Sequence, residues 1–282
     1  MRFRATMSQR KHGDFQRLIQ SLERANHKDC VLHLLPEEDN KITIALRADP
    51  SRSGCDCEIW CHLQADQWFD DYSIRSLNGN QILLDLTLEN LASAFRAAEK
   101  ADRIMMKLAK NPVPCIDIEI NATTYNLNHI VPVDVWTAAR ASSTPLVEPS
   151  VDTPEQLVWL PSLQRLCGLV EKLQKIDTTL YICADFEAST LKFRVAADTS
   201  TFETVFKVRM KQTGVPNEDG QDAEGPLEVA VDARMLSRFL HCYQVGSKHA
   251  VMGLLPTVIL MQVTAGAADE MQLIYYLPTL IV

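Results

Sequence analysis

The chain has 282 residues, 46% hydrophobic and 23% charged, and its 28 Lys and Arg against 36 Asp and Glu give a formal net charge of −8. This is the composition of an ordinary globular chain with ample material for a core, as one large or two medium domains. No apolar run reaches the roughly 20 residues that cross a bilayer, so we expect no membrane-spanning helix and no membrane partner.

The N-terminal residues Met1–Met7 alternate charged with apolar side chains. This pattern predicts a strand and lacks the continuous apolar segment of a signal peptide. We therefore expect a reducing compartment, in which the eight Cys remain thiols.

Two segments half a chain apart spell nearly the same amphipathic helix. Asp14–Arg24 aligns without a gap on Ser162–Lys172, with matching caps, apolar positions, Gln, Glu and basic residues. Leu86–Leu91 aligns in the same way on Val231–Leu236, and each of these continues as an amphipathic helix. A chain that repeats itself at half its length is predicted to contain two copies of one domain.

Most of the remaining chain reads as strands. Period-two alternation, as in Ile116–Ile120, predicts antiparallel sheets with one face exposed to water. Each half then places two helices on one face of antiparallel sheet, which is an α+β architecture. A stretch rich in Ser, Thr, Pro and Ala predicts a linker at 137–155 between domains at 1–136 and 156–282, and the acidic Gly214–Pro226 segment is predicted to be a surface loop.

The four predicted helices, at 14–26, 88–103, 162–176 and 232–245, each carry basic residues away from the apolar stripe. Together they hold ten basic and seven acidic side chains, a balance of +3, so the rest of the chain carries −11. This separation suits a protein that meets a polyanion on one surface, although solvated helix faces that bind nothing are an open alternative. The candidate residues are Arg17, Arg24, Arg96, Lys100, Arg103, Arg165, Lys172, Lys175, Arg234, Arg238 and His241.

The chemistry of an enzyme is missing from the sequence. The most metal-like cluster is Cys55, Cys57, Cys61 and His62, but Cys57 and Cys61 alternate with polar or bulky residues inside a predicted strand, which favours buried thiols over zinc. No His-Glu-x-x-His pair, Gly-x-Ser-x-Gly elbow or phosphate-binding Gly-Lys-Ser/Thr loop occurs. We therefore predict no catalytic residues, no metal and no cofactor.

Short matches spread along the whole chain resemble one family, that of the hydroxyurea-sensitivity subunit of the nine-one-one DNA-damage checkpoint clamp, within the PCNA-like sliding clamps. The matching segments are Met1–Ala5, Ile59–Leu63, Trp68–Phe69, Leu84–Leu91, Val131–Val133, Trp159–Leu163, Val170–Lys172 and Tyr275–Pro278.

The resemblance implies two tandem PCNA-like domains, with two helices per domain on the inner face, in a non-catalytic subunit of a heterotrimeric ring with two other clamp-like subunits. Such a ring encircles double-stranded DNA at damaged or stalled sites without sequence specificity, and an ATP-driven clamp loader opens it. It recruits activators of the checkpoint kinase ATR and repair enzymes. The basic residues named above would then face DNA, and the protein would be nuclear, and also cytoplasmic before assembly.

The resemblance also implies two strand edges that pair with neighbouring subunits, at about Leu127–Val135 and Phe202–Lys211. The candidate edge residues are Asn128, Ile130, Val131, Val133, Thr204, Val205, Lys207, Arg209 and Lys211. A partner-peptide groove would lie between the linker and the C-terminus, although the linker has few of the bulky apolar residues that such a groove prefers. The candidate groove residues are Leu146, Val147, Tyr276, Leu277 and Pro278.

Two other functions stay open. A replicative homotrimeric clamp for DNA polymerases would have the same fold, with edges complementary within one chain. A scaffold that does not bind DNA would carry the basic faces only as solvated surface.

Overall fold

The computed structural model describes residues 1–25, 27–48, 57–154, 156–197, 200–213, 226–266 and 270–281. Contacts divide the chain into two compact units, the first mainly Met1–Arg47 and Ile59–Glu148 and the second mainly Pro149–Thr264. Cys55 and residues 214–225 of the predicted acidic loop lie outside the described residues. None of the described helices has the length and apolar character to cross a membrane.

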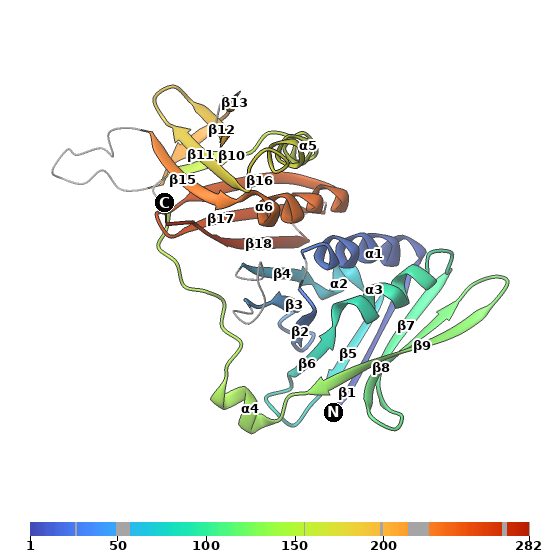
Figure 1. Ribbon diagram of the computed structural model, residues 1–282. Helices are drawn as coiled ribbons and strands as arrows, with labels where there is room; N and C mark the ends of the chain where they lie inside the picture. The colour runs from blue at the N-terminus through green and yellow to red at the C-terminus, as the bar shows by residue number, and fades with distance from the viewer. Residues whose placement is uncertain are drawn as a thin grey trace. The chain divides into compact units, whose positions relative to one another are not determined.

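The first unit consists of antiparallel strands with two long helices, α1 and α3, which Figure 1 shows in blue and green. Its elements are β1 (Arg2–Ser8), α1 (Gln9–Glu23), β2 (Asp29–Leu34), β3 (Lys41–Leu46), β4 (Glu58–Gln64), α2 (Ala65–Trp68), β5 (Asp71–Arg75), β6 (Ile82–Thr87), α3 (Leu88–Ala97), β7 (Arg103–Lys110), β8 (Pro114–Asn121) and β9 (Asn126–Val135). A short helix, α4 (Ala138–Ser143), follows in the predicted linker.

The second unit repeats this order with the helices α5 and α6. Its elements are β10 (Gln156–Trp159), α5 (Leu163–Leu173), β11 (Thr179–Asp185), β12 (Thr190–Ala197), β13 (Ser200–Lys207), β14 (Met210–Gln212), β15 (Leu227–Asp232), α6 (Ala233–Leu240), the 3-10 helix η1 (His241–Val245), β16 (Ser247–Leu254), β17 (Val258–Ala265) and β18 (Met271–Pro278).

The strand pairing is duplicated as well. In the first unit the order β5-β1-β7-β8-β9 continues through β6 to β2, β3 and β4. In the second unit the order β14-β10-β16-β17-β18 corresponds to the first of these series, and β15-β11-β12-β13 corresponds to β6-β2-β3-β4. All the described pairings are antiparallel, from β1 with β5 to β12 with β13. The predicted α+β class with two tandem copies is therefore confirmed.

Each helix buries one apolar stripe, as its periodicity predicts. In α1 the stripe is Phe15, Leu18, Ile19 and Leu22, and Phe15 meets Phe95 of α3 with ring centroids 4.9 Å apart. In the second unit Phe239 of α6 stacks on Tyr275 of β18 at 4.2 Å, and the Tyr275 hydroxyl donates to the Met235 carbonyl at 3.1 Å. The helices are thus fixed to the sheets by their inner faces, which leaves their outer faces free to carry charge.

Two helix limits differ from the prediction. Helix α1 begins at Gln9, and its N-cap Ser8 lies six residues before the predicted cap Asp14, because the buried His12 extends the apolar stripe by one turn. The His12 Nε2 atom lies 2.7 Å from the Ala101 carbonyl oxygen, so this nitrogen is hydrogen-bonded in the core, whereas the buried Nδ1 atom has no hydrogen-bond partner among the described residues. Helix α3 ends at Ala97, well before the predicted residue 103.

Strand β3 is buried on both faces from Ile42 to Leu46, whereas β4 keeps Glu58 and His62 partly exposed and Gln64 exposed on the face that also carries the buried Trp60. Residues 42–46 of β3 are all buried, and so is Trp60 of β4. One cause is the connection between the copies: Glu148 meets His62 of β4 at 3.1 Å, and so part of the connection lies over this strand.

We predict that Asp232→Ala destabilises the protein by about 1 kcal/mol at pH 7, because Asp232 is the N-cap of α6 and accepts from the Arg234 backbone N–H at 2.8 Å. Burial disfavours the charged form of this carboxyl, but the hydrogen bonds from Arg234 outweigh burial and lower its pKa. The stabilisation by Asp232 is thus fully present above the pKa of about 4 that its carboxyl has in the unfolded chain. It is lost as pH falls through the lower pKa of this carboxyl in the folded protein.

Urea unfolding of the wild type and the variant between pH 3 and 7 measures this difference. Glu187→Ala, in an exposed turn of the same unit, is the matched control and should change the free energy of unfolding little. An Asp232→Ala effect no larger than that of the control would contradict the capping role.

Candidate nucleic-acid interface

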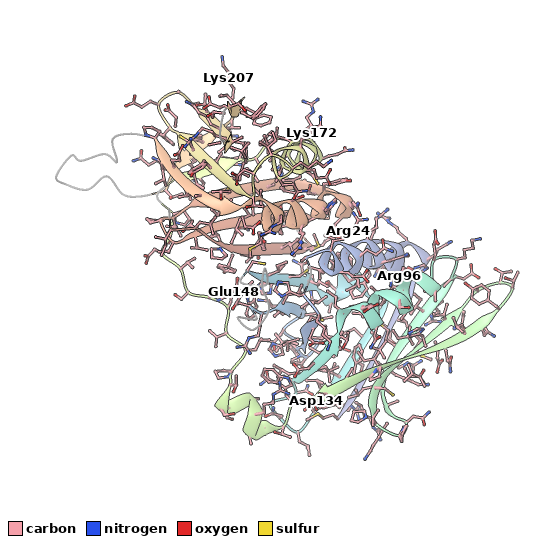
Figure 2. The ribbon with its side chains drawn as sticks, viewed as in Figure 1. Arg24, Arg96, Asp134, Glu148, Lys172 and Lys207 are labelled. Atoms are coloured by element: carbon pink, nitrogen blue, oxygen red, sulfur yellow. The ribbon has the colours of Figure 1, made fainter. Side chains whose placement is uncertain are left out.

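The two long helices of the first unit lie side by side, and their outer faces form one surface. Besides the contact between Phe15 and Phe95, an ion pair joins them: Arg96 Nη1 lies 2.7 Å from Glu23 Oε2. Figure 2 marks Arg24 and Arg96, which project from the ends of α1 and α3. A basic face shared by two helices is a suitable surface for a phosphate backbone.

The predicted basic residues of this unit are all exposed, but not all are helical. Arg17 and Arg96 lie on the helices, and Arg24 is the C-cap of α1. Lys100 lies in the turn after α3 and Arg103 begins β7, so both flank the helix pair, contrary to the prediction of a longer helix.

The second unit repeats the arrangement with α5 and α6. Arg165 and Lys172 are exposed on α5, two turns apart on the same side, and Lys175 is exposed in the turn that follows. Figure 2 shows Lys172 on this helix. Two of the predicted cations, Arg238 of α6 and His241 of η1, are partly buried, whereas the prediction placed them on the exposed face.

Ion pairs separate these cations into two groups. Arg17 pairs with Asp14, Arg96 with Glu23 and Arg234 with Asp232, so local carboxylates offset part of their charge. No ion pair within the described residues involves Arg165, Lys172 or Lys175 of the α5 region, nor Lys100, Arg103 or Arg238. A polyanion meets the most uncompensated charge on α5.

The late predicted start of α1 hid one further cation. Arg10 is exposed in the first turn of the observed helix. The signal that identifies it is the buried His12 three residues before Phe15, which continues the helical period toward the N-terminus.

The strand β9 has one open edge. Residues 126–132 pair with β8 and residues 133–135 pair with β6, and no described strand pairs with the other side of residues 126–132. Ile130 is 46% exposed there, and Asn128 is exposed beside it. Pro132 fits such an edge because it has no N–H to give to a neighbouring strand. Two predicted edge residues, Val131 and Val133, are buried and face the core.

The strand β13 is a second open edge, since β12 is the one described strand that pairs with it. Val205 is 48% exposed, Lys207 is exposed at the end of the strand (Figure 2) and Thr204 is partly buried. Phe202, a large exposed apolar residue on this edge, was missing from the predicted set.

The predicted continuous strand from Phe202 to Lys211 is wrong. It breaks after Lys207, and β14 joins another sheet, where Lys211 pairs with Leu157. The cause is the Trp159 backbone N–H, which donates to the Arg209 carbonyl at 2.9 Å and draws the chain toward β10. The Arg209 guanidinium also lies over the Trp159 ring. Arg209 and Lys211 therefore do not belong to the edge of β13.

The predicted groove residues differ in accessibility. Val147 is exposed and Leu146 and Pro278 are partly exposed, whereas Tyr276 and Leu277 are buried in β18. Tyr276 and Leu277 thus pack in the core. A partner-peptide groove at Leu146, Val147 and Pro278 remains a prediction.

The connection between the copies is more ordered than the prediction of a plain linker. Helix α4 is anchored to the first unit by Arg140, which pairs with Asp134 at 2.9 Å and with Asp85 and lies over the Trp136 ring. Thr137 caps this helix by accepting from the Arg140 backbone N–H.

The predicted burial of Cys57 and Cys61 is confirmed. The seven described cysteines are free thiols, and Cys57 and Cys61 are buried. Burial raises the pKa of the Cys61 thiol far above its usual range, as expected of a core thiol.

Comparison with known proteins places the chain in a family. Residues 1–281 match the family described as Hus1-like protein. The chain belongs to this family. It is 27% identical to checkpoint protein HUS1 of Homo sapiens over 79% of this chain and 80% of that protein, and 23% identical to the checkpoint protein hus1 homolog of Dictyostelium discoideum over 100% of this chain and 99% of that protein.

Solved structures identify the fold as PCNA-like. Proliferating Cellular Nuclear Antigen from Entamoeba histolytica aligns with a TM-score of 0.73 at 12% identity, over 99% of both chains. PCNA from Thermococcus kodakaraensis gives 0.72 at 15% identity, over 99% of this chain and 100% of that chain. At such identities the likeness establishes the fold, which agrees with the predicted one.

We predict that the triple variant Arg165→Glu, Lys172→Glu and Lys175→Glu weakens binding to duplex DNA at low salt. Because each lost phosphate contact removes about 0.9 from the slope of log Kobs against log salt, the slope should fall in magnitude by about 2 to 3. Fluorescence anisotropy with a labelled duplex across a salt series measures this.

The matched control reverses three exposed cations on strand ends of the other unit, Arg47→Glu, Arg75→Glu and Lys110→Glu, with the same change of net charge. Equal loss in both triples would mean that overall charge, and not the α5 face, governs binding.

Proposed function

We propose that this Hus1-like chain is a non-catalytic subunit of a DNA-damage checkpoint clamp, in which two other clamp-like subunits complete a heterotrimeric ring around double-stranded DNA. The observation that carries the proposal is the duplicated helix pair, which presents exposed Arg and Lys outward from the sheets in both copies. The relatives named as checkpoint proteins and the PCNA-like fold support it.

The charge on the helix faces suits a ring that slides. Tight phosphate contacts would oppose movement along DNA, so modest charge partly offset by acids such as Glu23 is favourable. Contacts of this kind go to the backbone and carry no base readout, which agrees with binding without sequence specificity. The net charge of −8 leaves the rest of the surface acidic and keeps DNA from other faces.

The two open edges suit ring closure. An unpaired strand edge exposes a row of N–H and C=O groups that another chain can extend. On β9, Leu127 and Ile130 are exposed three residues apart, and on β13 Phe202 and Val205 are exposed at the same spacing. Backbone pairing would supply affinity at each seam, and these apolar side chains would select the neighbour.

The remaining parts of the proposal follow from the family. An ATP-driven clamp loader would open the ring, and the loaded ring would recruit activators of the checkpoint kinase and repair enzymes. The protein would act in the nucleus, where its DNA substrate is, after assembly with subunits in the cytoplasm. Binding by encirclement needs neither a catalytic group nor a cofactor.

One solved structure with this fold is a complex of two different clamp chains, PCNA2–PCNA3 from Sulfolobus tokodaii, with a TM-score of 0.70 at 10% identity over 98% of both chains. A fold of this kind thus occurs in a complex of two different chains, and in the proposed ring the choice of partner would depend on the edges. The replicative alternative requires β9 and β13 of one chain to fit each other.

We predict that Ile130→Lys removes one clamp-like partner and Val205→Lys removes the other, because a charge on an open edge blocks strand addition. Both side chains are nearly half exposed, so neither change should alter the free energy of unfolding by more than about 0.5 kcal/mol. Affinity purification of the tagged full chain from native extract, with mass identification of the bound proteins, measures partner loss.

Val147→Lys introduces the same charge at an exposed apolar residue away from both edges and should retain both partners. A purified chain that forms a stable trimer of itself would favour the replicative function. A chain that captures no clamp-like subunit and does not bind duplex DNA would favour the scaffold.

A further inference from the structure

Three side chains of the types that commonly bind metal ions lie close together on the helix pair of the second unit. Cys167 and Glu171 are four residues apart and so share one face of α5, and His241 begins η1 at the end of α6. The Cys167 Sγ atom lies 3.7 Å from Glu171 Oε1 and 4.0 Å from His241 Nε2, and Nε2 lies 3.3 Å from Oε1. The repeat alignment shows that this grouping is particular to the second copy.

In the first copy the equivalent positions hold Ile19, Glu23 and Arg96. There, Glu23 and Arg96 form the 2.7 Å ion pair that joins α1 to α3. The second copy keeps the glutamate as Glu171 but has a thiol in place of the isoleucine and an imidazole in place of the guanidinium. An interhelical ion pair alone needs neither change, whereas a metal site needs both.

We propose that Cys167, Glu171 and His241 form a zinc site that joins α5 to the end of α6. Zinc bonds to sulfur at about 2.3 Å, to imidazole nitrogen at about 2.0–2.1 Å and to carboxylate oxygen at about 2.0–2.2 Å. Tetrahedral coordination with these bond lengths puts sulfur about 3.6 Å from each of the other two atoms and nitrogen about 3.4 Å from oxygen. The three observed separations agree with these values to within about 0.4 Å. Because Cys167 Sγ also lies 3.8 Å from Nδ1, the His241 ring must rotate for its Nε2 lone pair to point at the ion.

The donor types select the ion. A thiolate with an imidazole is a soft ligand set that favours zinc, whereas magnesium and calcium take oxygen ligands. One thiolate and one carboxylate also balance the +2 charge of the ion. The neighbouring Cys242 is buried, and its sulfur is not one of the three ligand atoms that lie within 4.8 Å of one another.

Burial gives the site an inner and an outer side. Cys167 is 3% exposed and forms the floor, while Glu171 and His241 are partly exposed at the rim. Zinc can therefore enter from solvent and take a water molecule as its fourth ligand. Because two ligands come from α5 and one from η1, which directly follows α6, bound zinc links the two helices that carry the basic face of this unit. The inference does not depend on the proposed clamp function.

Titration of the reduced full chain with Co²⁺, and competition with Zn²⁺, tests the site. We expect one Co²⁺ per chain, with the near-ultraviolet charge-transfer absorption of a cobalt thiolate, and displacement by Zn²⁺. Cys167→Ser should abolish the absorption, and His241→Gln should weaken Zn²⁺ binding by at least about 100-fold, since even loss of groups that only support metal ligands costs 10–100-fold.

Two controls make the outcome specific. Cys183→Ser changes a half-buried thiol on β11 and should leave metal binding unchanged. The double variant Cys167→Ile and His241→Arg reproduces the arrangement of the first copy, so it should fold, as judged by circular dichroism and melting temperature, and bind no metal. Absence of stoichiometric Co²⁺ binding, or an unchanged absorption in either Cys167 variant, overturns the proposal.

Discussion

The structure depends on the side-by-side packing of two helices across the sheets of each copy. The inner faces are fixed by apolar contacts such as Phe15 with Phe95 in the first copy and by the stacking of Phe239 on Tyr275 in the second. A glutamate on the first helix meets a basic residue from the end of the second in both copies, as Glu23 with Arg96 and Glu171 with His241. Because packing uses the inner faces completely, the outer faces are available for function.

The two copies use this common arrangement differently. The first copy pairs Arg17 and Arg96 with carboxylates, which lowers the charge that a ligand would meet. The second copy leaves the cations of α5 without ion pairs among the described residues and replaces the interhelical arginine by His241. The two copies thus share one arrangement of strands and helices but differ in the charged residues on their helix pairs.

The features that the sequence predicts correctly are those with local periodicity. The apolar stripes of α1, α3, α5 and α6 are visible at a spacing of 3.6 residues, and most strands at a spacing of two. The repeat adds long-range information, since aligned segments must occupy equivalent places. This is why the α+β class, the two copies and the exposed cations on the helices could be predicted.

The features that it misses depend on contacts between distant segments. The start of α1 was missed because polar residues and Gly13 hide the stripe that His12 completes against Ala101. The break after Lys207 has no local signal, because it depends on the contact with Trp159. Cys167 and His241 are 74 residues apart, so their proximity is apparent only in three dimensions.

The break after Lys207 has a mechanical consequence. It limits the free edge of β13 to eight residues, and in an antiparallel ladder only alternate residues direct their amide groups outward. Each backbone hydrogen bond contributes about 1 kcal/mol net, so separating a strand from this short edge would cost only a few kcal/mol in lost hydrogen bonds. In the proposed ring, this interface can open while both neighbouring subunits stay folded. The length of β13 would therefore set how easily the ring opens.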